Sequence, residues 1–147
     1  MDIQYRLATK EDVTEIFRMI HEFSIFIGDE EKLENSPEKM IKEWDHVIWC
    51  LAENSKKDIC GYAAMCITYH TWKGKSAYMD DLYVRESFRG KGVGKGLLNL
   101  VTEISRNNDC IELRWMVSDW NKKAQDFYLS QHAMIEKCDY NCYLKIS

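Results

Sequence analysis

The first third of the chain carries apolar side chains at every third or fourth position, the spacing that places them on one helix face. A short apolar stretch over 3–7 precedes this pattern and predicts a strand. The helix is predicted from five apolar positions: Val13, Ile16, Phe17, Ile20 and Phe23. A polar, acidic break over 28–35 follows. Ser36 and Pro37 then indicate the start of a second, short helix, because proline fits the first helical position.

The periodicity changes in the middle of the chain to short apolar runs that contain β-branched and aromatic residues. Such runs, separated by polar turns, are typical of antiparallel strands. Strands are predicted over 47–52, 59–69 and 77–84, with turns over 53–58 and 71–76. Two adjacent acids, Asp80 and Asp81, interrupt the third run.

The second half of the chain alternates between helical and strand patterns. A glycine-rich stretch over 88–98 runs directly into a helical apolar pattern, and alternating side chains predict a strand over 111–117. Asn121 is a suitable cap for a further helix. The apolar stretch over 140–146 predicts a last strand.

The predicted order of elements is β-α-α-β-β-β-α-β-α-β. Strands alternate with helices at both ends and follow one another in the middle. This order predicts a mixed sheet covered by helices, in the α/β or α+β class. A length of 147 residues suits one domain, over 1–147, with a single core.

Glycine is concentrated in one place. Four of the seven glycines lie within 88–98, namely Gly90, Gly92, Gly94 and Gly96. A strand, a glycine-rich turn and a helix form a ready anion site, because the first helical N–H groups lack partners and the helix dipole favours negative charge there. The basic residues beside these glycines are Arg89, Lys91 and Lys95. The stretch therefore predicts a ligand that carries a pyrophosphate.

Two common phosphate-binding patterns do not fit this stretch. The P-loop pattern fails because the second glycine of its spacing is replaced by Lys95, and the Ser or Thr that would hold magnesium is missing. The dinucleotide pattern G-x-G-x-x-G fails at the same position, and the stretch follows the fourth predicted strand instead of the first. An NTPase is therefore disfavoured.

Composition narrows the partners further. A net charge of −4 disfavours nucleic acid as a partner. No apolar run is long enough to cross a bilayer, so no membrane partner is expected. The first residues lack the basic start and apolar stretch of a signal peptide, which favours a cytoplasmic location. The six cysteines form no C-x-x-C pair and the four histidines are scattered, so no metal site is expected.

The glycine stretch matches R-x-x-G-x-G through Arg89, Gly92 and Gly94, and here the chain resembles the GNAT acetyltransferases. A second local match is WNKKAQDFY over 120–128. The stretch 68–98, TYHTWKGKSAYMDDLYVRESFRGKGVGKGLL, resembles the diamine acetyltransferase branch, which includes spermidine/spermine and thialysine enzymes. The resemblance implies acetyl-CoA as cosubstrate, a small-molecule amine as acceptor, a mostly antiparallel sheet with helices on both faces, and a homodimer.

The resemblance also implies where acetyl-CoA is held. The implied positions are the backbone of Leu82, Tyr83 and Val84 for the pantetheine arm, the turn Arg89, Gly90, Lys91, Gly92, Val93, Gly94 and Lys95 for the pyrophosphate, and Asn121 and Ala124 near the arm. Tyr128 is the implied general acid, because a hydroxyl near the sulfur assists departure of a thiolate. The alternative for Tyr128 is a core tyrosine on an apolar helix face.

The acidic pair is the candidate amine site. A carboxylate can bind a substrate ammonium and accept its proton. Because adjacent strand residues face opposite sides, Asp80 and Asp81 can share one site only if the strand bulges. By resemblance, Asp80 is the proton relay and Asp81 a substrate contact. Solvated strand residues are the alternative.

Other candidates for the amine site have plainer alternatives. Trp72 is expected to wall the channel, because an aromatic face suits a cation; an ordinary turn aromatic is equally compatible. Glu30 and Glu31 are candidates for the amine entrance, and a solvated acidic loop is the alternative. Two positions where polyamine enzymes carry acids hold Ile27 and His70 here.

The segment that matches the C-terminal substrate wall, over 136–143, also differs from those enzymes, and Asp139 and Tyr140 are the candidate substitutes there. The leading interpretation is direct acetyl transfer to a small primary amine. A protein or peptide N-terminal acetyltransferase and a non-catalytic acyl-CoA-binding module are kept as alternatives.

Overall fold

The computed structural model describes residues 2–137 and 140–146. The chain divides into two compact units, Met1–Trp115 and Met116–Ser147. The expectation of one functional domain over the whole chain stays a prediction. Asp139, a candidate of the C-terminal wall, lies outside the described residues. No helix within the described residues is long and apolar enough to cross a bilayer.

The first unit is built on one five-stranded sheet. Its strands are β1 (Ile3–Leu7), β2 (Ile48–Asn54), β3 (Ile59–His70), β4 (Gly74–Val84) and β5 (Leu113–Arg114). They lie in the order β1-β2-β3-β4-β5, antiparallel from β1 to β4, with β5 parallel to β4. The predicted class, a mixed and mostly antiparallel sheet with helices, is confirmed.

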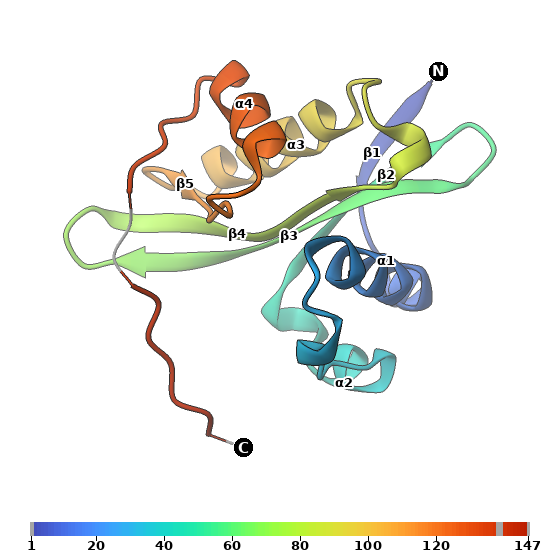
Figure 1. Cartoon of the computed structure of the whole chain (residues 1–147), viewed down its shortest axis with the longest axis horizontal. Coiled ribbons are helices and arrows are strands. Elements are labelled where there is room, and N and C mark those ends of the chain that lie inside the picture. The colour runs from blue at the N-terminus through green and yellow to red at the C-terminus, as the bar shows by residue number, and fades with distance from the viewer. Residues whose placement is uncertain (1, 138–139, 147) are drawn as a thin grey trace. The chain divides into compact units, whose positions relative to one another are not determined.

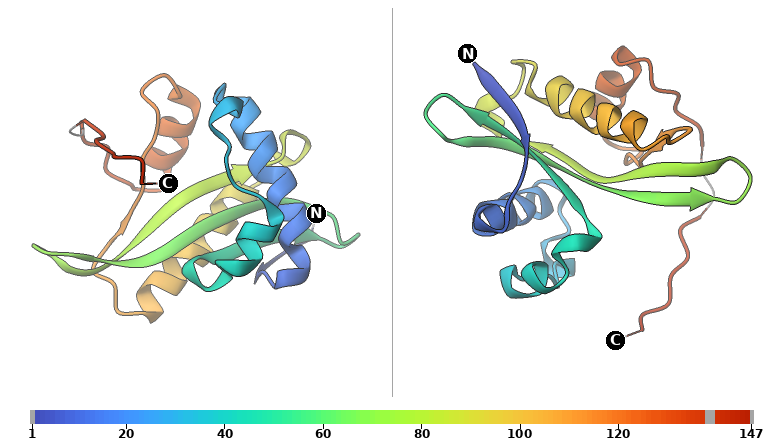
Figure 2. Two further views of the ribbon diagram at one scale, coloured as in Figure 1. Left: turned by 90° about the horizontal axis from the view of Figure 1, so that it is seen from below. Right: turned by 180° about the vertical axis from the view of Figure 1, so that it is seen from behind.

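Helices of the first unit cover both faces of this sheet, as Figures 1 and 2 show. On one face lie α1 (Val13–Ile27) and α2 (Pro37–Lys42), and on the other lies α3 (Val93–Asn107). Short 3-10 helices occur at Lys10–Asp12, Glu30–Lys32, Trp44–His46 and Glu86–Phe88. The two faces therefore have separate cores, and the candidate acids lie on the strand that both cores share.

The helix ends follow the local sequence signals. The Ser36 hydroxyl accepts a hydrogen bond from the Lys39 backbone N–H (3.2 Å) at the start of α2, as its position before Pro37 predicts. Gly28 ends α1 in the left-handed conformation with a φ of 78°, which glycine adopts without steric cost.

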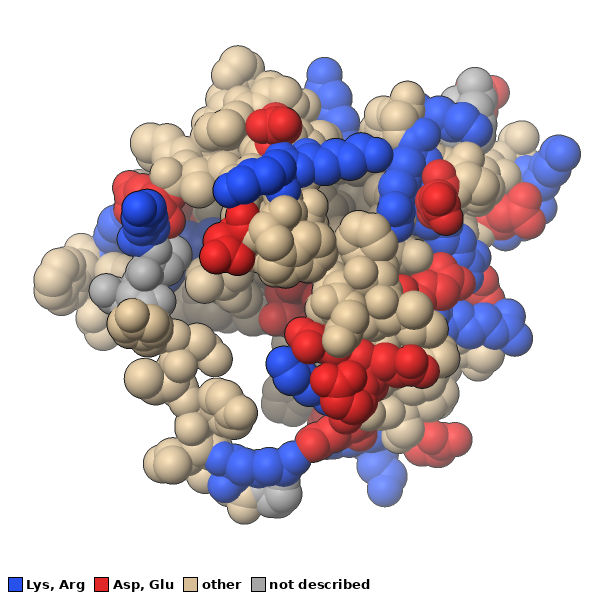
Figure 3. All heavy atoms as spheres, viewed as in Figure 1, with Lys and Arg blue, Asp and Glu red and all other residues tan. Residues whose placement is uncertain are grey.

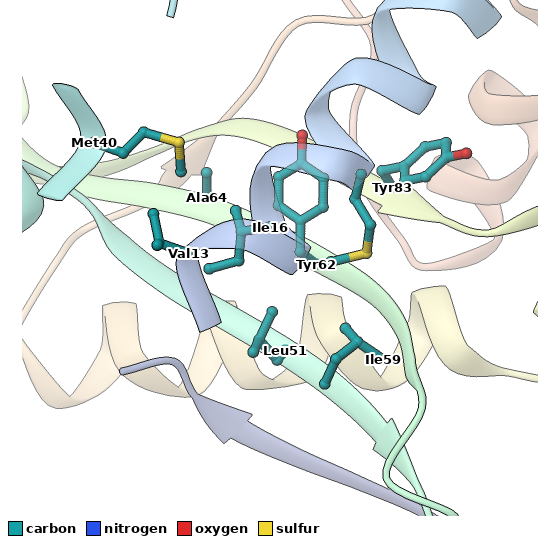
Figure 4. Packing of buried hydrophobic residues seen from close by; sticks show 9 residues of the cluster. Val13, Ile16, Met40, Leu51, Ile59, Tyr62, Ala64 and Tyr83 are labelled. Carbon is teal, nitrogen blue, oxygen red and sulfur yellow. The ribbon is translucent and has the colours of Figure 1, made fainter. Parts of the chain in front are cut away.

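The core beneath α1 positions the middle of β3. Ile16 and Met19 of α1 are fully buried, as are Leu51 and Tyr62 of the sheet. Figure 4 shows Tyr62 and Tyr83 on the same side of the sheet as Val13 and Ile16. Dense packing of this kind allows little side-chain movement, so the Tyr62 ring has a defined position.

The second unit contains α4 (Lys122–Ser130), which Asn121 caps as predicted by accepting a bond from the Ala124 N–H (3.2 Å). Two strand predictions are wrong. The described residues 140–146 form no strand and are all exposed. The strand predicted over 111–117 is reduced to the two residues of β5. Alternation predicts which side chains share a face, but a strand also needs a neighbouring edge to pair with, and β5 pairs with β4 at only two positions.

Candidate active site

A β-bulge places the acidic pair. Across β3 and β4, Met65 pairs with Met79 and Ala64 pairs with Asp81, so Asp80 is an extra residue on β4. Such an extra residue shifts the alternation of side chains by one position. The bulge that a shared site requires is therefore present at the acids themselves.

The shift turns both acids toward the α1 face of the sheet. Tyr62 and Ala64 belong to the core cluster under α1, so their partners Tyr83 and Asp81 share that face. Met79 lies on the opposite face, because its partner Met65 alternates with Ala64. Asp80 follows Met79 and so points to the α1 face, beside Asp81.

Asp81 is half-buried and hydrogen-bonded. The Tyr62 hydroxyl donates to its Oδ2 atom at 2.6 Å. Burial raises the pKa of Asp81 to about 6; the Tyr62 hydrogen bond acts in the opposite direction, and the charge of Asp80 adds to the increase. Burial, the charge of Asp81 and the hydrogen bond to it raise the pKa of Tyr62 well above its ordinary value, so Tyr62 remains a donor.

Asp80 is exposed. Its charge acts on the neighbours of the bulge: after burial, it is the next cause that raises the pKa values of Tyr78 and Cys66. The two acids therefore differ in setting, because Asp81 is half-buried and tied to a tyrosine whereas Asp80 is in contact with water.

The outer edge of β4 is unpaired beyond the acids. β5 pairs with β4 only at Ala77 and Tyr78. Within the described residues, Leu82, Tyr83 and Val84 pair with β3 on one side and with no strand on the other. Backbone N–H and C=O groups on such an edge are available to an extended ligand.

The glycine turn leads from β4 into α3. Gly90 and Gly92 have φ values of 73° and 82°, in the left-handed region, and nothing lies within 4 Å of the position that a Cβ atom would take at either one. Val93 begins α3, with Gly92 as its cap and Gly94 and Lys95 in its first turn. This open turn at a helix N-terminus fits a pyrophosphate.

A third glycine in the stretch has a different role. The backbone of Gly96 packs directly on the ring of Tyr5, and a Cβ atom would overlap that ring. Gly96 therefore allows β1 to approach α3, which explains part of the glycine concentration without any ligand.

The basic residues of the turn are partly engaged by the protein. Arg89 donates from Nε to the Val84 carbonyl (2.7 Å), and its guanidinium lies over the rings of Phe26 (4.8 Å) and Tyr83 (5.5 Å). Lys91 donates to the Ser87 carbonyl (3.0 Å), and Lys95 is exposed. Arg89 thus holds the turn against the end of β4.

Three predicted substrate residues of this unit lie away from the bulge or make no hydrogen bond or ion pair to the acids among the described residues. Trp72 is 92% exposed in the β3–β4 turn. Asp80 is six positions after Gly74, so at the rise of a strand the turn lies about 20 Å from the bulge. Within one copy of the chain, the fold does not bring Trp72 to the acids.

Glu30 and Glu31 are exposed in the 3-10 helix after α1. The Glu30 carboxylate lies 2.9 Å from His21 Nε2 and accepts a hydrogen bond from it when that nitrogen carries the proton. Figure 3 shows acidic side chains gathered over this part of the first unit. No hydrogen bond or ion pair among the described residues joins either glutamate to the acidic pair.

Ile27 is the last residue of α1, and His70 ends β3 with its Nδ1 atom accepting from the Trp72 N–H (3.2 Å). The predicted residues of the second unit lie on α4 or at its start. Ala124 is half-buried and Tyr128 is buried, with its ring 5.4 Å from that of Phe127.

Sequence reasoning missed two features of the site. Tyr62 gave no signal, because an aromatic residue in an apolar strand is ordinary; only the strand register brings it to Asp81. The second feature is Arg85, which pairs with Glu15 (2.7 Å) and Glu22 (3.0 Å) of α1. Those glutamates are seven residues apart and share a helix face. This spacing could have predicted a basic partner on a neighbouring element.

No group of three or more His, Cys, Asp or Glu side chains among the described residues is arranged to hold a metal ion.

Comparison with known proteins agrees with this geometry. A model of the acetyltransferase (GNAT) family matches residues 10–133. The thialysine N-epsilon-acetyltransferase of Mus musculus is 31% identical over 134 residues, covering 84% of this chain and 79% of that protein. The enzyme of the same name from Bos taurus is 36% identical over 87 residues, covering 58% of this chain and about half, 51%, of that protein.

Among solved structures, an aminoglycoside acetyltransferase from an uncultured soil metagenomic sample superposes with a TM-score of 0.81 at 17% identity, covering 99% of this chain and 97% of that one. At this identity the similarity concerns the fold alone.

The chain therefore belongs to the acetyltransferase (GNAT) family, whose members transfer acetyl groups from acetyl-CoA. This confirms the resemblance inferred from the glycine turn, and with it the class of enzyme.

Proposed function

We propose that this protein transfers the acetyl group of acetyl-CoA to a primary amine of a small molecule, by direct attack within a ternary complex. One observation carries the proposal. The acidic bulge, the unpaired edge of β4 and the open glycine turn follow one another along a single segment, 80–95. This order supports binding of a cation, an extended arm and an anion one after another along the segment.

Different residues of this segment bind different parts of acetyl-CoA. The N–H groups at the start of α3 and Lys95 hold the pyrophosphate, with Gly90 and Gly92 giving it access. The backbone of Leu82, Tyr83 and Val84 pairs with the pantetheine arm. When bound, acetyl-CoA supplies the thioester carbon that the amine attacks.

Protons must move in both directions. The substrate enters as an ammonium and is held by Asp80 and Asp81, which take one of its protons to free the nitrogen lone pair. That lone pair forms the amide bond as the carbon–sulfur bond breaks. Tyr128 gives a proton to the departing sulfur. As the amide forms, the nitrogen releases its second proton, which restores the Tyr128 hydroxyl through solvent. Overall, ammonium and acetyl-CoA give the amide, the CoA thiol and one released proton.

The acceptor class follows from the relatives and from two departures. The relatives from Mus musculus and Bos taurus are both named thialysine N-epsilon-acetyltransferases. A human spermidine/spermine N(1)-acetyltransferase-like protein 1 is 26% identical over 141 residues, covering 89% of this chain and 20% of that protein. Ile27 and His70 carry no carboxylate for distal amines, so we propose that a short diamine or a thialysine-like amino acid is preferred over a long polyamine. From the resemblance to the diamine acetyltransferase branch, we also propose a homodimeric enzyme.

The test is a thiol-release assay with acetyl-CoA and a panel of spermidine, spermine, putrescine, thialysine, lysine and a short peptide. We expect turnover with a small amine and a strong loss of kcat in Tyr128→Phe. Tyr69→Phe, at an exposed position of β3, is the matched control. Turnover with the peptide alone would identify a protein acetyltransferase. Acetyl-CoA binding without turnover on any amine would identify an acyl-CoA-binding module. Light scattering tests the dimer.

A further inference from the structure

Tyr62 is a buried hydrogen-bond donor with a fixed orientation. It is fully buried, and its ring lies between those of Trp49 and Tyr83, with centroids 6.2 Å and 6.3 Å away. Its hydroxyl is aimed at one atom, Oδ2 of Asp81, at 2.6 Å. A buried polar group with a single partner at this distance costs free energy when that partner is removed, so the pair acts as one unit.

We propose that Asp81 is the carboxylate that receives the ammonium proton, that Tyr62 is its positioning residue, and that Asp80 is the contact for the cation. This inference rests on the proposed function. It reverses the roles that the resemblance implies for the two acids, and it adds a tyrosine from the neighbouring strand.

The Tyr62 hydrogen bond to Oδ2 determines which carboxylate oxygen of Asp81 accepts the ammonium proton. Because Tyr62 occupies Oδ2, and no other hydrogen bond to Asp81 occurs among the described residues, Oδ1 is the atom available to a substrate N–H or to one bridging water. The proton passes from the ammonium to Oδ1, the nitrogen keeps the electron pair that attacks the thioester carbon, and Asp81 later returns the proton to solvent. Asp80, which is exposed, offers charge to the ammonium without being fixed in direction.

The charged and titratable groups around Asp81 set the sign of the pH effect. They are Tyr62 of β3, Asp80 next to Asp81 on β4, and Tyr83. Tyr83 raises the pKa of Tyr62, and its hydroxyl donates to Glu22 of α1 (3.3 Å). Burial raises the pKa of Asp81 to about 6 and the Tyr62 bond opposes that increase. Removing the hydroxyl therefore raises the pKa further, and the acid limb of the rate profile moves to higher pH.

The first arm of the experiment measures kcat/KM from pH 5 to 9 for the full chain and four variants. We expect Tyr62→Phe to shift the acid limb upward by about one pH unit. Asp81→Asn should lose about 100-fold or more in kcat, and Asp80→Asn should raise KM while keeping the acid limb. Tyr69→Phe, 75% exposed on the same strand, should match the wild type.

The second arm needs no substrate. Carbon-13 NMR titration of the aspartate carboxyl groups, with Asp81 assigned by its loss in Asp81→Asn, should show its pKa near 6 and a higher value in Tyr62→Phe. An unchanged value in Tyr62→Phe, or an acid limb that disappears in Asp80→Asn and persists in Asp81→Asn, would overturn the inference.

The two arms separate the inference from the function on which it rests. A wild-type enzyme that acetylates no amine refutes the proposed function, while the NMR titration still reports whether Tyr62 controls Asp81. If Tyr62→Phe does not fold, the comparison of Asp80→Asn with Asp81→Asn alone decides which acid receives the proton.

Discussion

Replacing Asp81 by Asn should stabilise the folded protein at neutral pH. The carboxylate of Asp81 is half-buried, and burial raises its pKa from an ordinary 3.8 to about 6. The folded state therefore binds the proton more tightly than the unfolded state does, and ionising Asp81 costs folding free energy. Asn has nearly the same shape and its amide oxygen can accept the Tyr62 hydrogen bond, but it carries no charge.

The magnitude follows from the two pKa values. The difference between 3.8 and about 6, at about 1.4 kcal/mol for each tenfold change in proton affinity, sets an upper limit of about 3 kcal/mol. Solvent screening of a half-buried group lowers this to about 1–3 kcal/mol. Because the pKa is raised on folding, the stability is complete below pH 3.8, is lost as the pH rises to about 6, and stays at the lower value above it.

Urea unfolding of the wild type and of Asp81→Asn at pH 4 and pH 7.5 measures the effect. We expect the two proteins to be similar at pH 4, and the variant to be the more stable one at pH 7.5. Asp80→Asn is the matched control and should change stability little, because Asp80 is exposed. Equal stability of wild type and Asp81→Asn at both pH values would refute the reasoning, since ionised Asp81 would then carry no burial penalty.

Three further substitutions test the frame of the site. In urea unfolding, Gly61→Ala should lose about 1–3 kcal/mol of stability. The added Cβ would lie 2.5 Å from the backbone carbonyl oxygen of Tyr83. No loss would show that β3 and β4 separate easily. The Cβ atom of Gly92→Ala would meet open space, but the residue must adopt a φ of 82°. We therefore expect a loss of about 1–2 kcal/mol of stability, and a smaller loss in Gly92→Asn. Equal losses in the two variants would rule out backbone conformation as the cause. Arg89→Lys loses the Nε bond to the Val84 carbonyl, and thermal unfolding should show a loss of about 1 kcal/mol, whereas an unchanged melting temperature would mean that Arg89 does not hold the turn.

Local signals predicted the helices and the glycine turn well. Ser36 caps α2 and Asn121 caps α4 as expected, because a cap depends on a side chain and backbone only three residues away. The strand over 140–146 was wrong for the opposite reason: strand formation needs a distant partner, and alternation alone cannot supply one.

The glycines show the same division within one stretch. Their density indicated close approach of another group, and at Gly90 and Gly92 the turn is open as expected. At Gly96 the approaching group is Tyr5 of β1, a contact between positions 91 residues apart, which no local pattern predicts.

The acidic pair marks the boundary between what sequence and fold determine. The sequence by itself determined that two carboxylates interrupt an apolar strand shortly before a glycine-rich turn, and the R-x-x-G-x-G motif of that turn already indicated the acetyltransferase (GNAT) family. The tertiary structure decided that the strand bulges at Asp80, that both acids face α1, and that Asp81 lies against a buried tyrosine of the next strand. The reason is physical: the proton affinity of a carboxylate depends on its burial and on its hydrogen-bond partner, and both come from chain segments brought together only by folding.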